Sequence, residues 1–148
     1  MVSNQMTAIW NNFDNGKKSL EYYADAIASL GAKTAASTSE IAEGLEKFAA
    51  IAETVGLSYE TATAAVATII DKTKQSADVV GTSLKTVFAR VESLSLGETL
   101  GDGVTLTKYS EALDKVGVKV LNADNELRDM DDILDDLGEK WQGLGRET

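Results

Sequence analysis

The stretch STSEIAEGLEKFAAIAETVGLSYETATAAVATIIDKT, residues 37–73, decides the fold. Large apolar residues recur every three or four positions in both of its halves, which is the period of an amphipathic helix. Ser37 and Glu40 have the spacing of a capping box at a helix start, and Gly56 is typical of the residue that follows a helix end. The stretch therefore predicts a helical hairpin that turns at Gly56.

Small side chains face each other across this predicted hairpin. Ala49, Ala52, Ala62 and Ala65 would let two helix axes approach closely. We interpret them as packing residues, and the alternative that they form a groove for a partner helix stays open.

The same helical period covers most of the chain and predicts about six or seven short helices. Ser58 and Ser76 are expected to cap helix starts, and Gly31 and Gly117 to end helices as Gly56 does. Trp141 is expected to complete the last stripe and to pack in the core. The stripes lie near residues 6–13, 20–30, 41–55, 62–70, 80–94, 106–116 and 130–141.

One stretch departs from the helical period. Val118 and Val120 alternate, a turn follows through NADN, and Leu127 comes next, which predicts a small β-hairpin near 118–128. We therefore expect a mainly all-α fold, a compact bundle with that one hairpin, and a single helical domain over residues 1–148.

The amino-acid composition excludes several classes of function. The chain has 148 residues, of which 43% are apolar, and a net charge of −10, so direct nucleic-acid binding is not expected. It has no cysteine and no histidine, which removes thiolate metal sites, the commonest metal ligand and the usual general base. No apolar run is long enough to span a bilayer, and the first residues lack the pattern of a signal peptide. No cofactor and no membrane insertion are expected.

Carboxylate pairs are the remaining catalytic option. A glycan hydrolase needs two such groups across a cleft, but 24 acidic residues make chance pairs inevitable. Glu40, Glu43 and Glu46 share one predicted helix face, which we interpret as solvated. The run from Asn122 resembles a calcium loop, but Leu127 and Ile133 stand where such a loop needs Gly and Glu. We therefore expect a protein that is not an enzyme.

The last predicted helix carries a dense group of acids. Like charges four residues apart are mildly destabilising, so an acidic face kept at that cost could meet a basic partner or a divalent cation. A purely solubilising face is the other interpretation. The candidate partner-binding residues are Asp131, Asp132, Asp135, Asp136 and Glu139.

Three long stretches together resemble the core region of phage tail tape measure proteins. They are residues 38–90, the segment LGETLGDGVTLTKYSEALDKVGV and the segment NELRDMDDILDDLGEKW, in the family's order. The resemblance implies a structural, non-enzymatic role in tail assembly and length determination. It implies a place in the lumen of the virion tail, and in the host cytoplasm during assembly.

The resemblance also implies partners. They are tail tube, baseplate or tip proteins and tail assembly chaperones, and self-association is a further expectation. Proteins of this family are usually many times longer, so we expect this chain to be a fragment of one. The rival interpretation is a stand-alone acidic helical module for protein–protein interaction.

Overall fold

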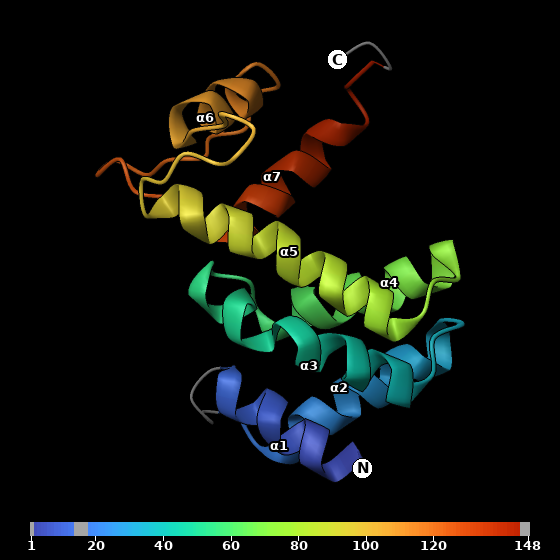
Figure 1. Ribbon diagram of the computed structural model, residues 1–148. Coiled ribbons are helices and arrows are strands. Elements are labelled where there is room, and N and C mark those ends of the chain that lie inside the picture. The colour runs from blue at the N-terminus through green and yellow to red at the C-terminus, as the bar shows by residue number, and fades with distance from the viewer. Residues whose placement is uncertain (1, 14–17, 146–148) are drawn as a thin grey trace. The chain divides into compact units, whose positions relative to one another are not determined.

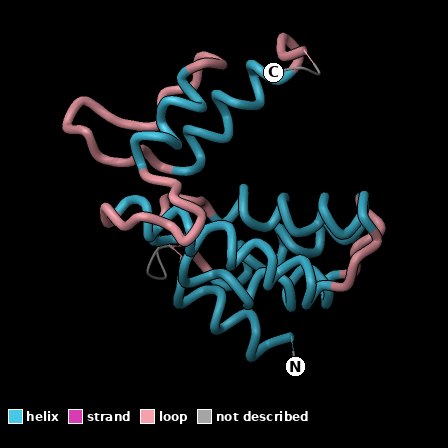
Figure 2. Tube along the Cα trace, turned by 45° about the horizontal axis from the view of Figure 1, so that its top comes forward, coloured by secondary structure: helices cyan, strands magenta, loops and turns pink. Residues whose placement is uncertain are grey.

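The computed structural model describes residues 2–13 and 18–145, and Figures 1 and 2 show its course. The all-α prediction is confirmed, because these residues form seven helices and no strand. The helices are α1 (Val2–Asn12), α2 (Leu20–Lys33), α3 (Thr38–Thr54), α4 (Tyr59–Thr73), α5 (Ala77–Ser95), α6 (Leu106–Asp114) and α7 (Met130–Trp141). The chain divides into two compact units, residues 1–88 and 89–148.

The predicted hairpin of α3 and α4 is the centre of the first unit. The capping box at its start is complete, because the Ser37 side chain accepts from the Glu40 backbone N–H and the Glu40 side chain accepts from the Ser37 N–H. At its turn, Gly56 has a φ of 73°, and the Leu57 N–H reaches the Ala52 carbonyl at 2.9 Å. This left-handed residue closes α3 as a Schellman motif, which glycine adopts without a steric penalty.

Small residues do bring α3 and α4 together. Ala49, Ala52 and Ala62 are buried, and Ala65 is half-buried. A Cβ on Gly44 would lie 2.8 Å from the Val66 Cγ1 atom, so no larger residue fits there without a shift. The packing interpretation of these residues is therefore supported.

An aromatic cluster fills the space between α2, α4 and the end of α1. The rings of Tyr23 and Tyr59 meet edge to face at 4.3 Å, and Phe13 meets Tyr59 in the same way at 5.6 Å. The Tyr59 hydroxyl donates to the Tyr23 carbonyl, and the Tyr23 hydroxyl donates to the Phe13 carbonyl. Burial raises the pKa of Tyr59 above its ordinary value of 10. Both hydroxyls are satisfied, so the cluster adds packing without leaving a buried polar group unpaired.

The prediction that Gly31 ends a helix is wrong. Helix α2 continues through Gly31 to Lys33. A Cβ on Gly31 would lie 2.9 Å from the Thr38 Oγ1 atom and 3.2 Å from the Thr38 nitrogen. The glycine therefore makes room for the start of α3. The Gly117 prediction is confirmed, since this residue has a φ of 81° just beyond α6.

In the second unit, the predicted β-hairpin is reduced to one antiparallel bridge between Leu121 and Leu127. The Asn122 Oδ1 atom accepts the backbone N–H groups of Asp124 and Glu126, which forms the tight turn. Only Arg128 separates Leu127 from the residue that precedes α7, so the returning arm is too short for a ladder. The buried side chains of this segment are Val118 and Val120.

Candidate interaction surfaces

The predicted acidic face lies on α7, with its first two acids in the first helical turn. Negative side chains at that end are favoured by the helix dipole. Asp132, Asp135 and Glu139 are exposed, whereas Asp131 and Asp136 are half-buried. The helix thus presents three of the five predicted residues openly to solvent.

Asp136 is held by a neighbouring cation that sequence reasoning missed. Arg128 Nη1 donates to Asp136 Oδ2 at 2.8 Å and to the carbonyl of Lys119 at 2.6 Å. The Arg128 backbone N–H also donates to the Val120 carbonyl at 2.9 Å. Arg128 therefore fastens the 118–128 turn to α7. Its positive charge is paired with Asp136 of the same unit. The only signal in the sequence was one arginine beside a run of acids.

The apolar stripe of α7 is covered at one end and open at the other. Met130 and Ile133 are buried, as the helical period predicted. Leu134 is 36% exposed and Trp141 is 67% exposed. The prediction that Trp141 packs in the core is therefore wrong. Helix α6 shows a related pattern, because none of its side chains is fully buried.

A polar cluster on the first unit ties Lys18, which precedes the N-cap residue of α2, to the start of α4. Lys18 Nζ lies 2.5 Å from Glu60 Oε1, the Tyr22 hydroxyl donates to the same oxygen, and Lys18 also lies over the Tyr22 ring. Burial alone would raise the pKa of Glu60, but the hydrogen bonds from Lys18 and Tyr22 bring it below its ordinary value of 4.5. The cluster is a structural contact between elements.

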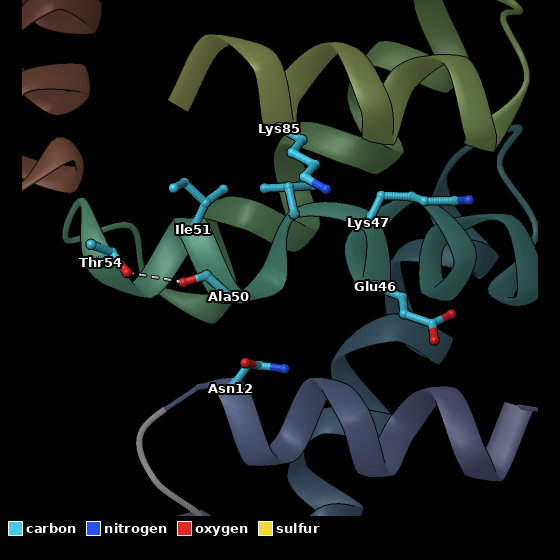
Figure 3. Close-up of a pocket in the computed structure, with 8 residues that line it drawn as sticks. Asn12, Glu46, Lys47, Ala50, Ile51, Thr54 and Lys85 are labelled. Carbon is cyan, nitrogen blue, oxygen red and sulfur yellow. Dashed lines mark hydrogen bonds between the residues drawn. The ribbon is translucent and has the colours of Figure 1, made fainter. Parts of the chain in front are cut away.

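A groove of about 320 Å³ is lined mainly by α3, with one residue each from α1 and α5 (Figure 3). Asn12 borders it from α1, and Lys85 extends toward α3 from α5 (Figure 3). The Thr54 hydroxyl donates to the Ala50 carbonyl at 3.2 Å, so its hydrogen is used within the helix. The lining residues are Asn12, Glu46, Lys47, Phe48, Ala50, Ile51, Thr54 and Lys85.

The three glutamates considered for carboxylate chemistry do not gather in this groove. Glu40 is used in the capping box, where hydrogen bonds from the Ser37 backbone and side chain lower its pKa below the ordinary 4.5. Glu43 is exposed, and Glu46 alone lines the groove. Within the described part of the chain, no buried side-chain nitrogen or oxygen lacks a hydrogen-bond partner, and no cluster of three metal-binding side chains occurs. The arrangement offers surfaces for contact.

Comparison with known families gives a match over the whole chain. The sequence matches the family described as phage-related minor tail protein over residues 1–148. The chain belongs to this family. Neither the curated proteins nor the solved structures contained a match to this tail-protein sequence. The family assignment supports a structural role in the phage tail and a location in the virion tail. None of the helices in the described ranges combines the length and the apolar character needed to cross a membrane.

Proposed function

We propose that residues 1–148 form a folded, non-enzymatic module of a much longer tape measure protein that acts in tail assembly and length determination. The observation that carries the proposal is the family match over the whole chain, together with the extended resemblance to tape measure proteins. The helical fold is consistent with it.

The fold bears on how such a module would contribute to tail length. One continuous helix of 148 residues would measure about 220 Å at about 1.5 Å per residue. The longest described helix, α5, has 19 residues, and α3 and α4 turn back on each other at Gly56. In the folded form, the hairpin of α3 and α4 covers less length than one continuous helix of the same residues would.

The acidic face of α7 is the surface we assign to partners. In this proposal the module lies in the tail lumen, after assembly in the host cytoplasm. Its acidic face contacts a tail tube, baseplate or tip protein, or an assembly chaperone. The exposed residues Asp132, Asp135 and Glu139 support this assignment, because no salt bridge within the described chain involves them.

An in-frame deletion of residues 1–148 from the parent gene tests the proposal. A folded module that takes part in assembly predicts either the loss of tails or tails shortened by far less than 220 Å, measured by electron microscopy. Tails that are otherwise normal but about 220 Å shorter would show that the segment is an extended ruler. As a control, a deletion of equal length elsewhere in the helical part of the parent should shorten the tail in proportion.

A further inference from the structure

One edge of α7 remains uncovered although its residues are apolar or small. Leu134, Gly138 and Trp141 follow each other at steps of four and three residues, so they share one side of the helix. Leu134 and Trp141 are 36% and 67% exposed, and a Cβ on Gly138 would meet no atom within 4 Å. We call these three residues the open edge of α7. A large indole beside an open glycine is the kind of surface that anchors another helix.

The charge beside the open edge has one sign. The helical period places Asp135 and Glu139 next to this edge, on the side that faces solvent, and both are exposed. Lys140 is the one basic residue of α7, and its Cε atom lies near Gly117, 3.6 Å from where a Cβ would stand. The Arg128 charge is already engaged by Asp136. The open edge is therefore flanked by carboxylates on one side, with no cation beside them on that helix face.

We propose that the open edge of α7 docks an amphipathic helix from another protein, with an apolar stripe flanked by lysine or arginine. The apolar stripe would cover Leu134 and Trp141, and the basic flank would meet Asp135 and Glu139. A second copy of this chain fits poorly, because residues 89–148 hold 14 acidic and only seven basic side chains, so like charges would face each other. The inference rests on the proposed function in one respect, namely that the docked helix belongs to a tail protein or an assembly chaperone.

A synthetic helical peptide tests the docking without any phage component. The probe is a fluorescein-labelled 18-residue peptide with leucines at helical spacing and lysines on the flanks. Fluorescence anisotropy measures its binding to the 1–148 chain. A second peptide keeps every leucine but carries glutamate in place of lysine. We expect the lysine peptide to bind at least about tenfold more tightly than the glutamate peptide, and its binding to weaken as salt is raised.

Variants of the chain locate the binding site. Trp141→Ser and the pair Asp135→Lys and Glu139→Lys should each weaken binding of the lysine peptide at least about tenfold. Val87→Ser removes an apolar side chain that is 52% exposed on α5, and the pair Glu43→Lys and Glu53→Lys reverses exposed charges on α3. These matched controls should leave binding within about twofold. All of the sites are exposed, and circular dichroism checks that each variant folds.

Three results would overturn the inference. They are equal binding of the two peptides, unchanged binding by Trp141→Ser, and sedimentation of the chain as a dimer that Trp141→Ser dissociates. The last result would assign the open edge to a second copy. None of these outcomes bears on tail length, so a failure here is separate from a failure of the deletion experiment.

Discussion

Gly81 of α5 lies directly against the backbone of Gly44 in α3. A Cβ on Gly81 would stand 2.5 Å from the Gly44 carbonyl oxygen and 2.8 Å from the Lys47 Cγ atom. Two further contacts join the same helices, a stacked pair of Phe48 and Phe88 with ring centroids at 5.9 Å and an ion pair of Lys47 and Asp78 at 2.9 Å. The close approach is possible because Gly81 lacks a side chain.

The first prediction concerns Gly81→Ala. In an open helix this change stabilises by up to about 1 kcal/mol, because alanine is the better helix former. At Gly81 the added methyl group would overlap backbone that cannot easily move, so we expect a net loss of about 1–3 kcal/mol. Urea unfolding followed by circular dichroism measures the free energy.

Gly138→Ala is the control for Gly81→Ala, because no atom lies within 4 Å of its Cβ position in α7. It should be neutral or stabilising by up to about 1 kcal/mol. A stabilised Gly81→Ala variant would contradict the close packing of α3 and α5.

The second prediction concerns the capping box of α3. Ser37→Ala removes the side chain that accepts the Glu40 N–H, and we expect a loss of about 1 kcal/mol in unfolding free energy. Ser37→Asp, which keeps an acceptor at the cap, should restore most of that loss. Equal stability of the alanine and aspartate variants in urea unfolding would mean that the cap contributes little.

The third prediction is a dependence of stability on pH. The pKa values of Glu40 and Glu60 are lower in the folded chain than their ordinary 4.5. The unfolded chain therefore binds protons first, and the stabilisation is fully present above about pH 4.5 and is lost as pH falls through the folded pKa values. We expect the melting temperature to be steady from pH 7 to 5 and to fall below about pH 4.

Glu40→Gln gives this pH dependence a residue-level test. It removes the charge from the cap, so the variant should melt below the parent chain at pH 6, and the difference should shrink toward pH 2.5. Glu43→Gln, an exposed neighbour on α3 outside the capping box, is the control. A gap that stays constant with pH would show that the Glu40 charge is not the cause.

The fourth prediction concerns Arg128, whose side chain is 24% exposed in its bond to Asp136. Arg128→Met keeps most of the apolar stem but removes the bonds to Asp136 and to the Lys119 carbonyl. We expect a loss of about 1–3 kcal/mol and faster hydrogen exchange at residues 119–128. Lys119→Ala breaks an ion pair with Asp114 in which the lysine is 73% exposed, and it should cost less than about 1 kcal/mol. Equal effects of the two variants would argue against the role assigned to Arg128.

The sequence was most informative where a local rule decides the structure. The Ser37 and Ser58 caps and the Gly56 turn follow from hydrogen bonds between residues a few positions apart, and the structure has each of them. Ser76 likewise accepts the Val79 N–H at 3.3 Å, just before α5. Such contacts require no knowledge of the rest of the chain.

The predictions that proved wrong concern residues whose role depends on contacts with distant parts of the chain. Gly31 looks like a helix end, but it is a packing residue because Thr38 approaches it, and the sequence does not show that approach. Trp141 fits the period of α7, but the period gives only the side of the helix and not whether another element covers it. The sequence does contain an indication for Gly81. A glycine within a strong helical pattern lowers helix stability, which suggests that another element packs against it.

The hairpin of α3 and α4 also has a kinetic consequence. Only residues 55–58 separate the two helices, so bringing them together costs little loop-closure entropy. Helical proteins rich in such local contacts fold in microseconds to milliseconds. If a force pulls this hairpin open, the two helices can pair again soon after the force is released.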